Sequence, residues 1–201
     1  MIQRLFRPRA RHCTGIPAFL LATALTAGCA TQNYPLVDVS EANARATQGM
    51  RLDAGDKVRV TVFDEPTLTG EYEIGTAGAV TMPLIADVSA AGSTPDQMAG
   101  AITAKLTQGG YVLNPHVAVD VMSYRPFYIL GEVGKPGEYT YAGQMSLLQA
   151  IAKAGGFTPR ANKGTVVVLR KSWGGGRKVV VGDPALIIMP GDTITVNESM
   201  L

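Results

Sequence analysis

The sequence predicts an α+β fold made of two small β-rich domains, each with one short helix, and three observations lead to this class. First, the chain has 23 glycines and 12 prolines but only 6% aromatic residues, a balance typical of short strands and frequent turns. Second, Val58, Val60 and Val62 alternate with polar residues, as in a half-buried strand. Third, each half of the chain contains one capping box, Thr94 with Gln97 and Ser146 with Gln149, which predicts a helix start.

The first predicted domain covers residues 51–123. Its strands are expected at Val58–Val62, Tyr72–Ile74, Ala79–Met82, Leu84–Val88 and Val117–Val121. Thr94 is the expected N-cap of its helix, and Pro95 suits the first helical position because its missing N–H has no helical partner there. Met98, Ile102 and Leu106 share one helical face, which predicts that this face is buried.

The second predicted domain covers residues 124–201. Its strands are expected at Phe127–Leu130, Tyr139–Tyr141, Thr165–Arg170, Lys178–Val181 and Thr193–Val196. A short helix follows Ser146, and its inner face is expected to consist of Leu148, Ile151 and Ala152. Gly155 and Gly156 end this helix.

The two domains share one sequence pattern. Leu52–Val60 and Ile188–Val196 both have the form apolar-x-x-Gly-Asp-x-apolar-x-Val. In both places turn residues lead into an alternating strand, so we expect the two strands to begin with the same kind of turn. Two copies do not make a repeat protein.

Residues 1–28 have the three-part layout of a secretory signal peptide. Four arginines fall within the first eleven residues, an apolar run extends from Ile16 to Ala27, and that run is shorter than the ~20 residues that span a bilayer. The whole chain has a net charge of +2, but residues 29–201 hold 14 basic and 16 acidic residues, so their net charge is −2. A chain so close to neutral lacks the basic surface of a nucleic-acid-binding protein.

The signal peptide ends at Leu25-Thr-Ala-Gly-Cys29, which resembles a bacterial lipobox with Thr26 at the usual leucine position. We therefore expect cleavage before Cys29, lipidation of its thiol and attachment to the outer membrane facing the periplasm. Ala30 differs from the aspartate that retains lipoproteins in the inner membrane. The alternative is an ordinary secretory peptide that happens to end in a cysteine. Residues 29–50 show no clear period, so they are expected to be a tether.

The sequence offers no recognisable catalytic or metal-binding constellation, so we expect neither an enzyme nor a bound metal or cofactor. Cys13 leaves with the signal peptide, and His116 is then the one histidine that remains. Asp64 with Glu65, and Glu71 with Glu73, are close together near turns, where carboxylates are usually only solvated.

Trp173 is the single tryptophan and precedes the glycines 174–176 between two predicted strands. A large aromatic side chain on an exposed tip predicts contact with a partner or with a glycan. The alternative is that the indole folds back onto its own domain.

Several motifs occur in the order found in one protein family. Arg51–Phe63, Gly70–Ile74, Met82–Ile85 and Thr94–Val119 resemble the N-terminal domain of outer-membrane polysaccharide export proteins. Phe127–Tyr139 and Leu147–Gly156 resemble the soluble-ligand-binding β-grasp domain of the same proteins. The resemblance implies that residues 51–123 are a polysaccharide export domain and that residues 124–201 are β-grasp-like.

The resemblance also implies a function in capsule or exopolysaccharide export. Family members form homo-oligomeric rings that meet an inner-membrane co-polymerase, and the exported polysaccharide passes through unchanged. Residues 197–201 cannot form the amphipathic helix with which larger members line a pore, so a separate outer-membrane β-barrel partner is expected. The alternative function is a monomeric periplasmic lipoprotein that binds a glycan or another small ligand.

Overall fold

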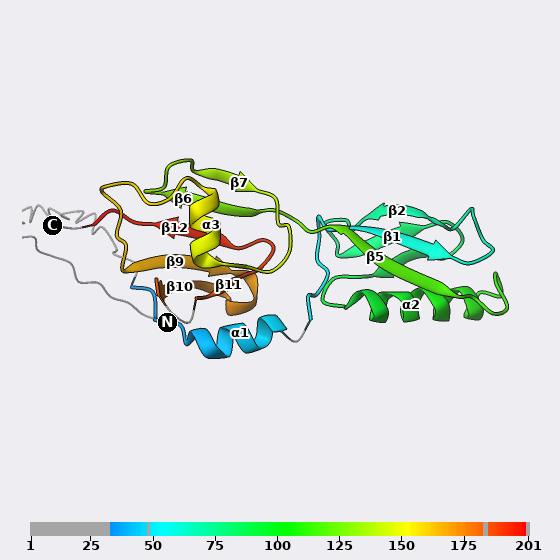
Figure 1. Ribbon diagram of the computed structural model, residues 1–201. Helices are drawn as coiled ribbons and strands as arrows, with labels where there is room; N and C mark the ends of the chain where they lie inside the picture. Colours follow the sequence, from blue (N-terminus) through cyan, green and yellow to red (C-terminus); the bar gives the residue numbers. More distant parts are fainter. Residues whose placement is uncertain (1–32, 48, 183–184, 200–201) are drawn as a thin grey trace, which may run out of the picture. The chain divides into compact units, whose positions relative to one another are not determined.

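The computed structural model describes residues 33–47, 49–182 and 185–199, and it confirms the α+β class (Figure 1). The elements before residue 124 are α1 (Val39–Thr47), β1 (Lys57–Val62), β2 (Gly70–Glu73), β3 (Ala79–Met82), β4 (Ala86–Ser89), α2 (Pro95–Gln108) and β5 (Val117–Ser123). Those after it are β6 (Phe127–Gly131), β7 (Gly137–Tyr139), β8 (Met145–Ser146), α3 (Leu147–Lys153), β9 (Thr165–Arg170), the 3₁₀ turn η1 (Lys171–Trp173), β10 (Gly175–Val180), β11 (Ile187–Ile188) and β12 (Thr193–Val196).

One hydrophobic core lies between α2 and a three-stranded antiparallel sheet in the order β2-β1-β5. The alternating valines of β1 are all buried, as the sequence predicts. The capping box of α2 is also confirmed, because the Thr94 hydroxyl accepts from the Gln97 amide and the Gln97 side chain accepts from the Thr94 amide. Met98, Ile102 and Leu106 are fully buried.

The second core lies between α3 and a five-stranded mixed sheet in the order β10-β9-β12-β6-β7. β12 runs parallel to β6, and the other neighbouring strands of this sheet are antiparallel. Phe127 and Ile129 of β6 point into this core together with Ile194 of β12. In Figure 1, α3 lies in front of this sheet, which is the β-grasp arrangement of one helix held against a mixed sheet.

The expected inner face of α3 is wrong by one position. Leu147, Ala150 and Ile151 are buried, whereas Leu148 is 44% exposed and Ala152 is exposed. The helix begins at Leu147 after the Ser146 cap, as predicted, but its buried stripe at i, i+3 and i+4 starts at Leu147 and not at Leu148. As a result, a leucine points away from the core.

The two Gly-Asp turns have the same hydrogen bonds, as the shared pattern predicts. In the first, the Asp53 amide donates to the Asp56 carboxylate (2.9 Å) and the Asp56 amide donates to the Asp53 carbonyl (3.1 Å). In the second, the Met189 amide donates to the Asp192 carboxylate (2.9 Å) and the Asp192 amide donates to the Met189 carbonyl (3.1 Å). In each turn the aspartate therefore closes a three-residue loop from both sides.

Each of these buried aspartates also binds an arginine. The Asp56 carboxylate accepts from the Arg125 amide (2.8 Å) and from Nη1 of its guanidinium (3.0 and 3.1 Å). The Asp192 carboxylate accepts from Nε and Nη2 of Arg170 (2.9 and 2.7 Å). Arg125 also lies against the second turn, because a Cβ atom at Gly191 would stand 2.9 Å from its Nε. Arg125 thus contacts both turns.

Tyr141 has the one buried side-chain oxygen without a hydrogen-bond partner among the described residues. Burial raises the pKa of Tyr141 to about 12, so the hydroxyl stays protonated, and its donor is unused. We expect Tyr141→Phe to leave the free energy of unfolding unchanged or to raise it by up to about 1 kcal/mol, because removing an unsatisfied buried polar atom relieves its desolvation cost. Chemical denaturation measures this change. A loss of more than about 1 kcal/mol would mean that the hydroxyl makes a stabilising bond.

Residues 33–50 correct the expectation of a structureless tether over residues 29–50. Val39–Thr47 form a helix, and Leu36 forms a parallel bridge with Lys178 of β10. Ala42 is buried in the second core, and Val37, Val39 and Met50 pack against it. The segment lacks a strong apolar period because alanines make up most of its buried face. Cys29 and the predicted signal peptide lie outside the described residues.

Among the helices of the described residues, none has the length and hydrophobicity needed to cross a membrane.

Candidate functional site beneath the N-terminal helix

Backbone pairing with the edge of the second sheet places the segment before α1. The Val37 amide donates to the Lys178 carbonyl (2.9 Å), and the Lys178 amide donates to the Pro35 carbonyl (2.8 Å). The ring of Tyr34 lies against Gly176, where a Cβ atom would stand 2.6 Å from the ring. A glycine is therefore needed at this position for the segment to lie so close to β10.

Helix α1 is fixed to the second domain by one asparagine. The Asn43 side chain donates to the Ala185 carbonyl (3.0 Å) and accepts from the Ile187 amide (2.9 Å). Asp38 accepts from the Ser40 amide (2.9 Å) and so caps the start of the helix. The face that α1 presents to the domain carries small side chains, Ala42 and Ala46, each 4% exposed.

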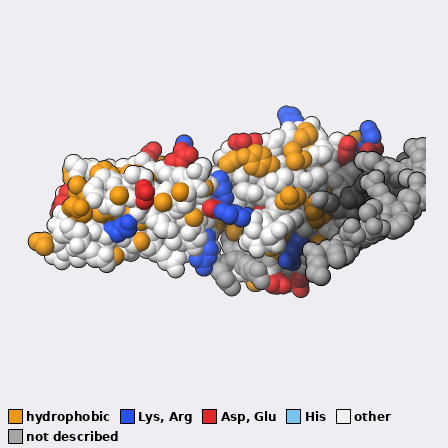
Figure 2. Space-filling view, turned by 180° about the vertical axis from the view of Figure 1, so that it is seen from behind, with side chains coloured by type: hydrophobic (Ala, Val, Ile, Leu, Met, Phe, Trp, Pro, Cys, Tyr) orange, Lys and Arg blue, Asp and Glu red, His pale blue; other side chains and the backbone are white. Residues whose placement is uncertain are grey.

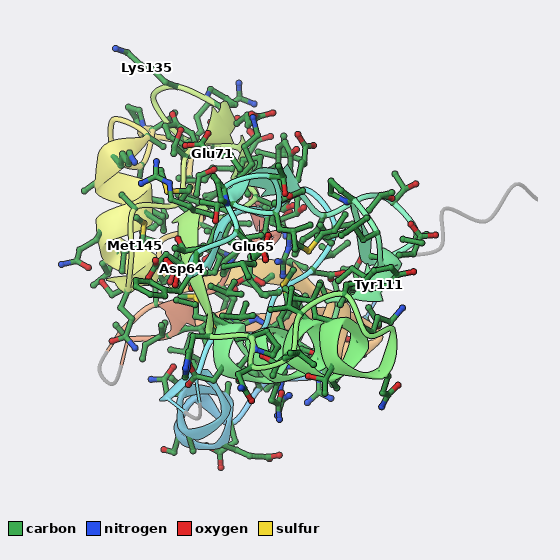
Figure 3. The ribbon with its side chains drawn as sticks, turned by 90° about the vertical axis from the view of Figure 1, so that its right-hand side faces the viewer. Asp64, Glu65, Glu71, Tyr111, Lys135 and Met145 are labelled. Atoms are coloured by element: carbon green, nitrogen blue, oxygen red, sulfur yellow. The ribbon has the colours of Figure 1, made fainter. Side chains whose placement is uncertain are left out.

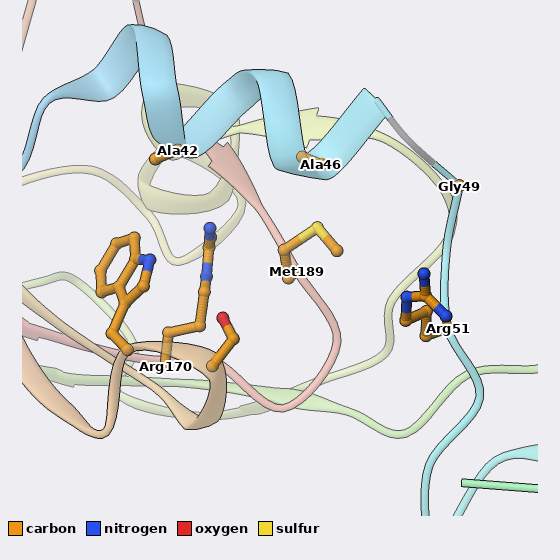
Figure 4. A pocket seen from close by; sticks show the side chains of 8 residues that line it. Ala42, Ala46, Gly49, Arg51, Arg170 and Met189 are labelled. Atoms are coloured by element: carbon orange, nitrogen blue, oxygen red, sulfur yellow. The ribbon is translucent and has the colours of Figure 1, made fainter. Parts of the chain in front are cut away.

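Because these alanines are short, a cavity of about 250 Å³ remains beneath α1 (Figure 4). Its lining residues are Ala42, Ala46, Gly49, Arg51, Arg170, Ser172, Trp173 and Met189. They combine an aromatic ring, a thioether, a hydroxyl and two guanidiniums, although the charge of Arg170 is paired with Asp192. Such a lining suits a small, partly apolar ligand with hydroxyl or anionic groups. The described lining residues include no pair of acid and base for catalysis.

Trp173 forms one wall of this cavity. The residue is half-buried in η1, and its ring packs against the second core. The guanidinium carbon of Arg170 lies 4.5 Å from the ring centroid and that of Arg177 lies 5.6 Å from it. Of the two arrangements left open by the sequence, the indole adopts the one folded back onto its own domain. Contact of Trp173 with a partner or a glycan stays a prediction.

Trp173→Ala is expected to destabilise the second domain. The change removes a half-buried ring and its cation–π contacts with Arg170 and Arg177, so we expect the free energy of unfolding to fall by about 1–3 kcal/mol. Trp173→Phe, the matched control, retains an aromatic face, so its free energy of unfolding should fall by less. Thermal denaturation followed by circular dichroism measures both. An unchanged midpoint for Trp173→Ala would contradict the packed arrangement.

A group of charges lies where the first Gly-Asp turn meets the second domain. Lys171 donates to Asp53 (2.6 Å), and Arg125 Nη2 lies 4.0 Å from the same carboxylate. Burial alone would raise the pKa of Asp53, but Lys171, the Ala54 amide and Arg125 together hold it below its usual value. A carboxyl group whose pKa is lower in the folded than in the unfolded protein stabilises the fold. This stabilisation is complete when the pH is above the unfolded-state pKa near 4, and it is lost as the pH falls through the folded-state pKa. These contacts should therefore persist at mildly acidic pH.

The carboxylates considered from the sequence do not form a site. Glu71 pairs with Arg59 (2.7 Å) and Glu73 pairs with Lys57 (3.9 Å) on the exposed face of the first sheet. Asp64 and Glu65 lie on the loop after β1 (Figure 3). Within the described ranges, no cluster of three or more His, Cys, Asp or Glu residues could hold a metal ion. His116 is exposed beside Phe63.

Comparisons with known protein families agree with this two-part structure. Residues 44–122 match the family described as polysaccharide biosynthesis/export protein. Residues 126–182 match the SLBB domain. The two matches follow each other along the chain; the first contains the first hydrophobic core, and the second contains most of the second core, which continues to Val196. The chain belongs to the polysaccharide export protein family.

The chain is similar to two curated proteins. It is 35% identical over 132 residues to the exopolysaccharide production protein ExoF of Rhizobium meliloti. The aligned region is 60% of this chain and 31% of ExoF. It is 27% identical over 142 residues to the polysialic acid transport protein KpsD of Escherichia coli. The aligned region is 68% of this chain and 25% of KpsD. The chain thus spans a third or less of the length of these relatives.

Proposed function

We propose that this protein is a component of an export conduit for a capsular or extracellular polysaccharide. It would be held at the outer membrane by lipids on Cys29 and would face the periplasm. The observation that supports this proposal is the order of the two matched regions, an export region and then an SLBB domain, over residues 44–182. The names of both relatives, one for exopolysaccharide production and one for polysialic acid transport, agree with it.

In this proposal several copies of the chain form a closed ring around the polymer, which passes through without chemical change. Its partners are an inner-membrane co-polymerase and an outer-membrane β-barrel. Sedimentation-velocity ultracentrifugation of the full-length protein, extracted from membranes in mild detergent, tests the ring. We expect one discrete oligomer of three or more copies. A monomer at micromolar concentration would contradict the ring.

The second candidate function is a monomeric periplasmic lipoprotein that binds a glycan or another small ligand. The cavity beneath α1 favours it, because Trp173, Ser172 and Arg51 offer a ring, a hydroxyl and a cation to one ligand. Oligomeric state separates the two functions, since a conduit needs a closed ring and a simple binding protein does not.

Cys29→Ser is expected to abolish lipid attachment and release the protein from the membrane. A hydroxyl cannot replace the thiol in the thioether bond, and two acyl chains give stable anchoring. Only Ala30–Asn33 separate Cys29 from Tyr34, which lies against β10. Metabolic labelling with a radioactive fatty acid and membrane fractionation measure the change, with Cys13→Ser as the matched control. Equal labelling of the Cys29→Ser variant and the wild type would contradict the anchor.

A further inference from the structure

On the face of the second sheet that is turned away from α3, three large apolar side chains are partly exposed. Six side chains of this sheet point away from α3, and together we call them the open face. They are Tyr128, Leu130, Val167, Leu169, Thr193 and Thr195. The strand registers place them in two rows, because Thr193 lies beside both Tyr128 and Leu169, and Thr195 lies beside both Leu130 and Val167. Figure 2 views this domain from the side opposite α3.

The open face is apolar but partly solvated. Tyr128 is 38% exposed, Leu130 is 46% exposed and Leu169 is 41% exposed, whereas Val167 at the centre of the face is 4% exposed. None of these six side chains is charged, but Lys178 of β10 lies directly beside Val167 at one edge of the same face. Large exposed apolar side chains on neighbouring strands mark a surface that another molecule covers.

An apolar side chain also projects from the opposite side of the same domain. Leu148 of α3 is 44% exposed, and Gln149, Ala152 and Lys153 are the other exposed residues of this helix. Because α3 packs on the inner face of the sheet, its outward side and the open face are on opposite sides of one layer. Contact between these two surfaces of successive copies is heterologous, and a heterologous contact that closes on itself makes a ring.

At the β7 edge of the open face, away from Lys178, the charges of the two surfaces are complementary. Glu138 of β7 borders the open face, since it lies directly beside Tyr128. On the helix side, Lys153 is the only charged residue of α3, and Lys135 lies beside the end of the helix, where its amide donates to the Ala154 carbonyl (2.7 Å). The side chain of Lys135 projects into solvent in Figure 3. A basic helix border can therefore face an acidic sheet border.

We propose that α3 of one copy docks through Leu148 onto the open face of the next copy, with Lys153 facing Glu138. This proposal rests on the ring described above and names the surfaces that hold it together. A polysaccharide is a poorer occupant of the open face, since Tyr128 is its one aromatic ring and it lacks the carboxylate and amide groups that pair with sugar hydroxyls.

Mixing two variants tests this docking. Leu148→Glu damages the helix side and Leu130→Glu damages the sheet side, and both positions are exposed, so the fold should be kept, as thermal denaturation would show. In sedimentation-velocity ultracentrifugation of the full-length protein in detergent, each variant alone should associate about tenfold more weakly than the wild type, or worse. An equal mixture should form dimers, because each pair retains one intact contact. Leu84→Glu, at an exposed leucine outside both surfaces, is the matched control and should assemble like the wild type.

The outcomes separate this docking from the ring itself. A wild-type monomer would overturn the proposed ring. A wild-type ring together with normal assembly of Leu148→Glu or Leu130→Glu would overturn the docking alone. Weak variants whose mixture forms no dimers would overturn the heterologous contact. Association restored in a Lys153→Glu/Glu138→Lys double variant, but absent from each single variant, would support the charge pairing.

Discussion

Asp192→Ala is expected to lower the free energy of unfolding of the second domain by about 3–5 kcal/mol, because it leaves the charge of Arg170 buried and unpaired. Asp192 is 1% exposed and Arg170 is 8% exposed, and two parallel hydrogen bonds join them. The change also removes the acceptor for the Met189 amide and so opens the second Gly-Asp turn. Urea denaturation followed by the fluorescence of Trp173, the single tryptophan, measures the stability of this domain.

Two further variants show whether the buried charge is the cause. Arg170→Met/Asp192→Leu removes both charges and should be less damaging than Asp192→Ala, because no buried ion is left without a partner. Glu71→Ala breaks an ion pair whose side chains are 49% and 64% exposed, and it should leave the unfolding midpoint almost unchanged. If the double variant is as unstable as Asp192→Ala, the loss of stability comes from changed packing and not from the unpaired charge.

Asp56→Ala is expected to destabilise both domains, with a loss of about 2–4 kcal/mol in the first. The fully buried carboxylate accepts bonds from the Asp53 amide and from both the backbone and the side chain of Arg125. Arg125 in turn lies against Gly191 of the second turn, so its release should reach the second domain.

Two probes measure the effect of Asp56→Ala separately. Circular dichroism reports the unfolding of both domains, and Trp173 fluorescence reports the second domain. We expect both midpoints to move to lower urea concentration. Asp56→Asn, the matched control, retains an oxygen acceptor, so its free energy of unfolding should fall by less. A shift in circular dichroism with an unchanged fluorescence midpoint would contradict the coupling through Arg125.

Local sequence patterns were sufficient to predict the elements that depend on local interactions. Helix α2 follows from Thr94, Gln97 and three apolar residues at i, i+4 and i+8, all of which lie within one segment. The shared Gly-Asp pattern predicted two turns of the same kind, and in both the aspartate closes its own loop with the same hydrogen bonds. Strands β3 and β12 have the predicted bounds.

Features that depend on distant parts of the chain could not be predicted in this way. Arg170 ends an apolar strand, and its burial depends on Asp192, which comes 22 residues later. Helix α1 is held by Asn43 through backbone groups 142 and 144 residues away. The cavity lies between α1, Trp173 and Met189, so no single segment contains its pattern. The outward position of Leu148 was missed because Leu147 and Leu148 are adjacent and equally apolar, and packing against distant strands decides which of them is buried.

Polymer secretion in cells tests the export function most directly. A strain that lacks this chain is complemented with the wild type or with an empty vector, and the polysaccharide outside the cells is measured by its sugar content. We expect secretion to be lost without the chain and restored by the wild type, with an unchanged repeat unit. Equal secretion by the strain with the empty vector would contradict a function in export, and an altered repeat unit would point to chemical modification of the polymer instead.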